Sequence, residues 1–306
     1  FSAKAQKYWT GGGAAGQWSD ANNWNPTGVP TSSSDVVLDN LHGVSSSYNV
    51  ILPITSVTIK SIRITPLTGD SIRLTLPNNN TLHPALTFNG PGYVLIIDSG
   101  GVFKNSSGAL SSTPDIIGIS TNDSIKINSG GKYIHNTARS HAYLVDQLSK
   151  STGTEKGIFK FDMPGNGGVT LSLTGNYYGT IELSADSAGG TKTYSGNGAS
   201  DLTIRGDLII NTGVNFNAAV TANILIAGDL KIDGNFDNSP ASGTTKRSII
   251  FNGSANQIIS GSANLTFGQF FKTLNINKNS IVTVAINIGL NDTDIHASLI
   301  VDTSAN

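Results

Sequence analysis

The sequence predicts an all-β fold, a right-handed parallel β-helix with about 20–25 residues in each coil. The first observation is a repeat: residues 204–210 read IRGDLII and residues 226–232 read IAGDLKI, so that Ile204 corresponds to Ile226. The segment LNIN at 274–277 also matches LKID at 230–233, at twice that offset along the chain. Each coil of a β-helix leaves an apolar face that only the next coil covers, so a repeat of this length predicts stacked coils.

The composition is the second observation. The 306 residues include 35 glycines and no cysteine, and only 13% of them are charged, with a net charge of −1. Glycine and small polar residues favour turns and exposed sheets over helices. The low charge excludes the basic face that nucleic-acid binding requires, and the absence of cysteine excludes disulfides and thiolate metal sites. No run approaches the roughly 18 apolar residues of a spanning helix, so we expect no membrane span.

The opening of the chain, residues 1–33, is distinct from the remainder. Ala3-Lys4-Ala5 has the A-x-A form of a signal-peptidase site, so we interpret the first five residues as the remnant of an export signal. The three tryptophans of the chain all follow in this opening: Trp9, Trp18 and Trp24. The end edges of a solenoid need a cover, so we predict a tryptophan-rich cap here and the β-helix over residues 34–306.

Short alternating runs predict the strands in order. Residues 35–38 form the first clear strand, and residues 57–64 and 72–76 alternate apolar with polar residues, which predicts one buried face. Residues 94–97 are continuously apolar, which predicts a strand buried on both faces. Further strands are expected at 158–161, 169–173, 180–183, 249–251, 257–259, 282–284 and 299–301.

A second repeat relates residues 97–103, IDSGGVF, to residues 127–133, INSGGKY, so that Phe103 corresponds to Tyr133. Its offset is longer than that of the first repeat, which predicts one coil plus an insertion at 113–122. The Ser-Gly-Gly sequence predicts a sharp corner between two sheets. The segment 136–157 is the least strand-like part of the chain. Its residues 140–149 predict a short helix within a loop that protrudes from the coil.

The opening resembles a known family. Residues 8–24 read YWTGGGAAGQWSDANNW and lead into VPTS and DVV, which resembles the start of large secreted surface proteins of Bacteroidetes. IFNGS at 250–254 and QIISG at 257–261 are similar to the parallel β-helix repeats of those proteins, so the resemblance covers nearly the whole chain. It implies a secreted or outer-surface location on a bacterium and further domains C-terminal to Asn306. Such proteins include adhesins, polysaccharide-binding proteins and polysaccharide-degrading enzymes.

A polar cluster follows the second repeat. Eliminative cleavage of an acidic polysaccharide needs a general acid or base and a cation beside the uronate carboxylate, and this cluster has both residue types. The candidate lyase residues are Tyr133, His135, Arg139, His141 and Tyr143. In the alternative interpretation, Tyr133 stacks on the neighbouring coil at the position of Phe103, and the other residues decorate the protruding loop.

Carboxylate pairs for glycoside hydrolysis are not evident. Glu155 and Glu182 are the only glutamates, and a hydrolase needs two acids roughly 5–10 Å apart. Asp98, Asp207 and Asp229 recur with the repeats, so we interpret them as corner residues and not as catalytic groups.

Two short stretches contain oxygen ligands of the kind that Ca²⁺ prefers. One is Asp292 with Asp294, and the other is Asp20 with Asn22 and Asn23. Neither matches a calcium loop of the EF-hand type, so a polar turn is the alternative, and no other cofactor is expected.

Aromatic side chains are the remaining candidates for ligand binding, because sugars stack on exposed aromatic rings. The candidates are Trp9, Trp18, Trp24, Tyr177 and Tyr178. The tryptophans have an alternative role as a plug at the N-terminal end of the solenoid. Neighbouring residues of a strand point to opposite faces, so at most one of the two tyrosines is exposed.

These observations favour a non-catalytic secreted or cell-surface protein that binds polysaccharide or an extracellular glycan, or acts as an adhesin. The first alternative is a polysaccharide lyase on a β-helix scaffold, and the second is a structural spacer within a larger surface protein. The fold alone does not choose among them.

Overall fold

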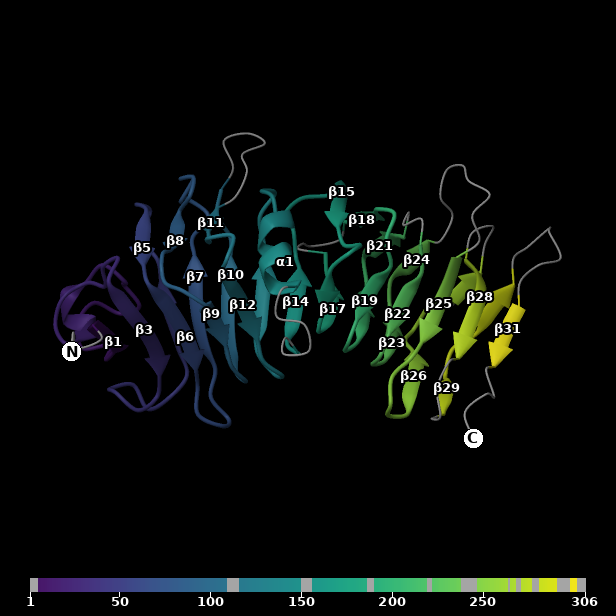
Figure 1. Ribbon diagram of the computed structural model, residues 1–306, viewed down its shortest axis with the longest axis horizontal. Helices are drawn as coiled ribbons and strands as arrows, with labels where there is room; N and C mark the ends of the chain where they lie inside the picture. The colour runs from purple at the N-terminus through teal and green to yellow at the C-terminus, as the bar shows by residue number, and fades with distance from the viewer. Residues whose placement is uncertain are drawn as a thin grey trace. The chain divides into compact units, whose positions relative to one another are not determined.

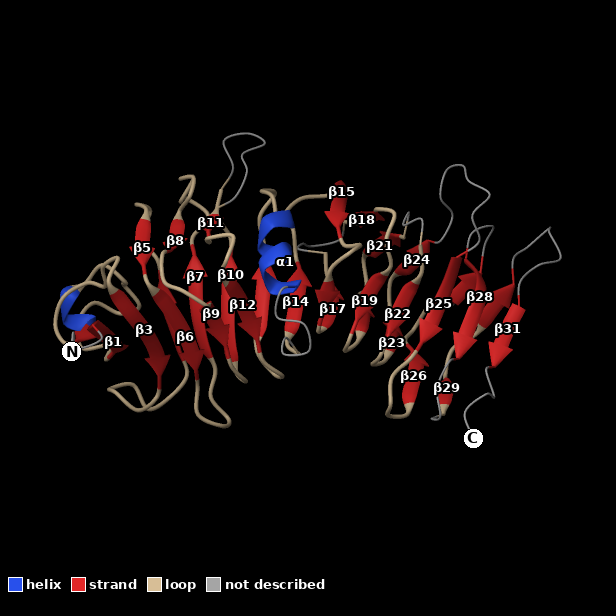
Figure 2. Cartoon of the chain, in the orientation of Figure 1, coloured by secondary structure: helices blue, strands red, loops and turns tan. Residues whose placement is uncertain are grey.

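The computed structural model is nearly all-β, with about 4% helix, and its parallel strands stack as a β-solenoid of about nine turns over the described residues (Figures 1 and 2). The chain divides into two compact units, residues 1–159 and 160–306. The described residues are 5–108, 116–149, 156–185, 190–218, 222–237, 247–263, 265–267, 271–276, 281–290 and 298–301.

The coils of the first unit contribute strands to three sheets, here called A, B and C. Sheet A contains, in spatial order, β2 (Trp24–Asn25), β1 (Ala5–Trp9), β3 (Ser34–Asp39), β6 (Ser61–Thr65), β9 (Tyr93–Ile97) and β12 (Ser124–Ile127). Sheet B contains β4 (Tyr48–Ile51), β7 (Ile72–Leu76), β10 (Gly101–Asn105) and β13 (Lys132–His135). Sheet C contains β5 (Val57–Ile59), β8 (Leu86–Phe88) and β11 (Ile117–Gly118).

The strand register confirms the second sequence repeat. Ile97 pairs with Ile127 in sheet A and Phe103 pairs with Tyr133 in sheet B, both between parallel strands. The Ser-Gly-Gly corner is confirmed by positive φ at Gly100, 78°. Equivalent residues of successive coils therefore lie one above the other, at the spacing of neighbouring strands, about 4.8 Å.

One coil of the first unit is longer than the sequence predicts. Ile62 pairs with Leu95, so one coil of this unit exceeds the expected length of about 20–25 residues. The predicted insertion at 113–122 is wrong where it is described, because β11 lies within it and pairs with β8 as part of the regular coil. Residues 113–115 lie outside the described residues.

The predicted strand at 57–64 is two strands. β5 belongs to sheet C and β6 to sheet A, and the chain turns at Lys60, whose backbone N–H donates to the carbonyl of Ser34. The alternation of buried and exposed residues changes phase here, since Ile59 and Ile62 are both buried although they are three positions apart. That change of phase is the sequence signal of a corner.

The N-terminal segment covers the first coil along two sheets. β1 pairs in parallel with β3 at the end of sheet A, and β2 pairs antiparallel with β1. Gln17 bridges Ile51 of β4, and the backbone N–H of Trp18 donates to the carbonyl of Ile51. These pairings satisfy backbone groups at the start of sheets A and B, as a cap requires.

The second unit contains coils of the same kind. Its sheet F contains β16 (Tyr177–Tyr178), β19 (Leu202–Ile204), β22 (Ile224–Ile226), β25 (Arg247–Phe251), β28 (Phe271–Ile276) and β31 (Ser298–Val301). A further set, here sheet D, contains β17 (Thr180–Leu183), β20 (Leu208–Ile210), β23 (Leu230–Ile232), β26 (Gln257–Ser260) and β29 (Val282–Val284). Sheet E contains β15 (Gly167–Ser172), β18 (Lys192–Asn197), β21 (Val214–Asn217) and β24 (Asn235–Asp237), and sheet G contains β27 (Leu265–Phe267) and β30 (Ile288–Leu290). β14 (Ile158–Phe161) contains the boundary between the two units.

The first sequence repeat is confirmed, and its extension to LNIN at 274–277 is wrong. Ile204 pairs with Ile226, and Leu208 pairs with Leu230, as the repeat predicts. Leu274, however, pairs with Ile249 in sheet F, whereas Leu230 lies in sheet D. The similar sequence marks a strand of a different sheet of its coil.

The predicted short helix is α1 (Ala142–Ser149). Its residues Leu144, Val145 and Leu148 are buried, and the helix packs beside β12 of the first unit. The prediction of a protruding loop is therefore wrong for the described part of this segment, because an apolar face of α1 covers the coil. Residues 150–155 lie outside the described residues.

Candidate functional site

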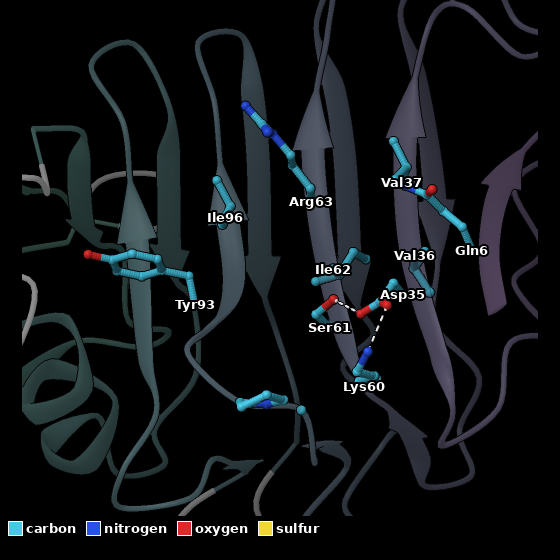
Figure 3. A pocket seen from close by; sticks show the side chains of 12 residues that line it. Gln6, Asp35, Val36, Val37, Lys60, Ser61, Ile62, Arg63, Tyr93 and Ile96 are labelled. Atoms are coloured by element: carbon cyan, nitrogen blue, oxygen red, sulfur yellow. Dashed lines mark hydrogen bonds and ion pairs between the residues drawn. The ribbon is translucent and has the colours of Figure 1, made fainter. Parts of the chain in front are cut away.

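A groove of about 480 Å³ lies on the outer face of sheet A (Figure 3). Strands β1, β3, β6 and β9 supply its lining, together with the turn before β9. In this view Tyr93 lies at one end of the groove and Gln6 at the other. The groove therefore crosses several coils, so its residues come from segments far apart in the sequence.

The strand register brings these residues together. Asp35 is paired with Ser61, and Val37 is paired with Arg63, which is in turn paired with Ile96. Alternate residues of a strand point to opposite faces, so these outward positions form rows across the coils. The core beneath them consists of the inward residues of the same strands, such as Val36, Ile62 and Leu95.

The prediction that residues 94–97 are buried on both faces is wrong at one position. Val94, Leu95 and Ile97 are buried, but Ile96 is partly exposed and lines the groove. The register between β9 and β12 shifts at Ser124, so two consecutive residues of β9, Val94 and Leu95, are both buried. The outward Ile96 supplies an apolar floor beside charged neighbours.

Two ion pairs flank the groove. Lys60 Nζ lies 2.9 Å from Asp35 Oδ2, and Ser61 Oγ donates to Asp35 Oδ1 at 2.6 Å. Arg63 Nε donates to Asp98 Oδ2 at 2.6 Å. These pairs hold the long cationic side chains across the sheet surface, where their remaining N–H groups can meet a ligand.

Asp98 is held ionised by its hydrogen bonds. Burial raises the pKa of its carboxyl, but hydrogen bonds from Arg63 and Asn128 outweigh burial, and the net pKa is lowered. Asn128 occupies the equivalent repeat position one coil later and donates to Asp98 at 2.5 Å. Asp98 thus lies at the predicted corner, and its carboxylate also positions the Arg63 side chain.

Sequence reasoning predicted none of the residues that line the groove, and Tyr93 is the aromatic one among them. Its side chain is 42% exposed, and Lys126 Nζ lies 5.5 Å from its ring centroid, a cation–π geometry. The only sequence signal is an aromatic residue directly after the turn at 90–92, at the start of an apolar run. An exposed ring beside paired charges offers a ligand an apolar face and hydrogen-bonding groups side by side.

The predicted lyase cluster is buried. The side chains of Tyr133, His135, Arg139 and His141 are between 0% and 6% exposed, so they do not line a groove open to a polymer. Tyr143 is partly exposed, and its hydroxyl donates to the carbonyl of Ile119. The alternative of a decorated loop is also wrong for the buried histidines and Arg139, because the chain here packs into the coil.

Tyr133 stacks in the core as the repeat predicts. Its ring is perpendicular to that of Phe103 at 5.6 Å and lies 4.9 Å from that of Phe159, and burial raises the pKa of its hydroxyl. Burial lowers the pKa of His135 to about 3 and that of His141 to about 4. Both imidazoles are therefore neutral at pH 7 and unlike a general base poised near neutrality.

The three tryptophans form one aromatic cluster in the first unit. Trp24 is edge-on to Trp9 at 5.0 Å and to Trp18 at 4.7 Å, and all three side chains are at most 2% exposed. A buried ring offers no face to a sugar. This removes the tryptophans as binding candidates and leaves their interpretation as the core of the cap.

The paired tyrosines of β16 point to opposite faces, as predicted. Tyr177 is 40% exposed, whereas Tyr178 is fully buried. The guanidinium carbon of Arg205 lies 4.8 Å from the centroid of the Tyr177 ring. Tyr177 is therefore the surface aromatic of the pair, and Tyr178 belongs to the core.

The recurring aspartates serve the corners. Asp207 Oδ1 accepts the backbone N–H of Asp229 at 2.8 Å, and Asp229 Oδ1 accepts that of Ile258 at 2.8 Å. Each carboxylate thus caps the strand that begins in the next coil. Glu182 pairs with Lys160 at 3.0 Å, and Glu155 lies outside the described residues.

The metal candidates do not come together as a site where they are described. Asp20 accepts the backbone N–H groups of Ala14 and Asn22, which lower the pKa of its carboxyl, and so it organises a polar turn. Asp292 and Asp294 lie outside the described residues. Within the described ranges, no group of three or more histidine, aspartate or glutamate side chains has the geometry to hold a metal ion.

Comparison of the chain with protein family models, with curated proteins and with solved structures finds no match in any of the three. Among the described residues, no helix combines the length and the apolar character needed to cross a membrane.

Proposed function

We propose that this protein is a non-catalytic glycan-binding protein, secreted or held at the surface of a bacterium, and that the groove on sheet A binds an extended polysaccharide. The observation that carries the proposal is Tyr93, an exposed ring at one end of a groove flanked by the Asp35–Lys60 and Arg63–Asp98 pairs. The A-x-A motif at residues 3–5 and the family resemblance of the opening segment support the proposed location.

The chemistry of the groove matches that of a sugar. A pyranose ring has an apolar C–H face that stacks on an aromatic ring, and a rim of hydroxyls that both donate and accept hydrogen bonds. The Asp35 carboxylate accepts hydrogen bonds, and the Lys60 and Arg63 side chains donate them. Ile96 lies between these polar groups and Tyr93 and gives the floor an apolar patch.

The groove is open and crosses successive coils, which suits a polymer more than a small molecule. A polymer gains affinity from several weak contacts made together. The burial of the candidate lyase residues argues against the enzymatic alternative, because a polymer does not reach buried side chains.

A matched pair of tyrosines tests the proposal. Tyr93→Ala in the groove and Tyr177→Ala in the second unit each remove an exposed ring, since the two side chains are 42% and 40% exposed. Binding of the full chain to a panel of neutral and acidic polysaccharides is measured by affinity electrophoresis and by calorimetry. We expect Tyr93→Ala to weaken binding by about 5- to 30-fold, as loss of one stacked ring costs roughly 1–2 kcal/mol.

Tyr177→Ala is expected to bind as the unmodified protein does. Equal loss in both variants, or loss in Tyr177→Ala alone, would refute the assignment of the groove. An absence of binding to every polysaccharide would refute glycan binding and would favour the structural-spacer alternative. Release of unsaturated uronate products would favour the lyase.

A further inference from the structure

Arg139 is a buried cation without a partner among the described residues. Its side chain is 2% exposed, although it lies in the connection just beyond the end of β13. Within the part of the chain that the structure describes, none of its guanidinium nitrogens, Nε, Nη1 and Nη2, makes a hydrogen bond. A guanidinium has five N–H donors and no acceptor. All five donors are buried away from water here, and no hydrogen bond to a described residue replaces their hydration.

This charge is not removed by deprotonation. Burial lowers the pKa of Arg139 from its ordinary value of 12.5, but an arginine side chain in a protein keeps its proton at neutral pH. A lysine or a histidine in such a place would become neutral instead. An isolated buried charge is among the most costly features of a fold, so a counter-charge is needed.

The backbone at Arg139 is fixed by the coils beneath it. His135 Nε2 donates to the Arg139 carbonyl at 3.0 Å, and the Arg139 backbone N–H donates to Thr137 Oγ1 at 3.2 Å. Thr137 Oγ1 itself donates to the carbonyl of Ser107, one coil earlier, at 2.6 Å. The guanidinium therefore extends from an anchored backbone segment.

The described groups around Arg139 do not supply negative charge. His135 and His141 are neutral at pH 7, because burial lowers the pKa of each well below its ordinary value. The first residue of α1, Ala142, follows shortly after, and the N-terminal end of a helix carries partial positive charge.

We propose that Arg139 binds a compact anion of the halide or carboxylate class, buried between the end of β13 and the start of α1. The burial of the guanidinium restricts its occupant to a small anion and excludes a polysaccharide chain. The anion supplies the counter-charge. It also accepts hydrogen bonds from the guanidinium N–H groups, for which the described residues offer no acceptor. This site is separate from the groove on sheet A, and its function is to complete the packing of α1 against the coil.

Anion exchange tests the proposal on the full chain. Thermal unfolding is followed at constant ionic strength while sodium isethionate, whose bulky sulfonate does not fit, is replaced by sodium chloride or by sodium formate. We expect a saturable rise of the unfolding temperature by several degrees with one or both small anions. Chloride binding is measured independently by the broadening of the ³⁵Cl resonance and by its reversal with formate.

Two variants locate the site. Arg139→Met removes the charge and keeps an unbranched side chain, and we expect it to abolish the anion-dependent rise. Arg73→Met, at an exposed position of β7, is the matched control and is expected to keep it. An unmodified protein that responds equally to chloride, formate and isethionate would overturn the proposal, and so would an unchanged response in Arg139→Met. If Arg139→Met does not fold, the absence of formate-reversible ³⁵Cl broadening in the unmodified protein refutes it.

Discussion

Acidification is expected to destabilise the first unit through His135 and His141. In the folded protein their pKa values are lowered to about 3 and about 4, against an ordinary value of about 6.5 in the unfolded chain. Below pH 6.5 the unfolded chain therefore binds two protons that the folded chain does not. Stability is constant with respect to these groups above pH 6.5, and it falls as the pH drops toward the folded pKa values.

The size of the effect follows from the shifts. One pKa unit corresponds to about 1.4 kcal/mol. Lowering the pH by two units from 6.5 therefore reduces the free energy of unfolding by up to about 3 kcal/mol for each histidine. For the pair the loss between pH 6.5 and 4.5 is about 5 kcal/mol, a large fraction of the roughly 5–15 kcal/mol that stabilises a typical domain. The main cause is burial for both rings, and repulsion from His141 adds to it for His135.

Urea unfolding at a series of pH values measures this loss. The fluorescence of the buried tryptophans reports on the same unit. The double variant His135→Gln, His141→Gln is expected to lose most of the slope between pH 6.5 and 4.5, whereas the control His83→Gln, at an exposed position, is expected to keep it. Stability that does not change over this range, or a double variant with the original slope, would refute the reasoning.

Further substitutions test the packing and the corner hydrogen bonds. Trp24→Ala is expected to destabilise the first unit by about 3–5 kcal/mol in urea unfolding, as removal of a buried aromatic does. Gly228→Ala would place a Cβ in steric conflict with the backbone of Gly206 and should lower the unfolding temperature, while Gly168→Ala, with no atom within 4 Å, should not. Asp229→Ala should cost about 1 kcal/mol and Asp229→Asn less, because Asn keeps the accepting oxygen.

The sequence repeats predict the stacking of the coils correctly where the two matching segments lie in the same sheet. The pairs Ile204–Ile226 and Phe103–Tyr133 follow directly, because stacked coils place like residues on like. The repeat was misleading for Leu274, since strands of different sheets share the same alternation of apolar and polar residues. Which sheet a strand joins depends on the corners before it. In the sequence, a corner such as Lys60 is marked only by one change of phase in the alternation of buried and exposed residues.

The candidate site was less accessible to sequence reasoning. Recurrence correctly assigned Asp207 and Asp229 to corners, because a residue repeated in every coil has a role in every coil. The sequence predicts a protruding loop for the cluster around His135, because this segment is the least strand-like part of the chain. The structure buries it because the apolar face of α1 packs onto the coil.

The sequence by itself determined that this chain is a stack of β-coils with a tryptophan-rich opening, because apolar periodicity and repetition are properties of short segments. Only the tertiary structure decided where the candidate binding surface lies. Asp35, Arg63 and Tyr93 come from three different coils and become neighbours through stacking. The state of Arg139, buried and without a hydrogen-bond partner among the described residues, was equally invisible, because it depends on which distant segments fail to reach the guanidinium.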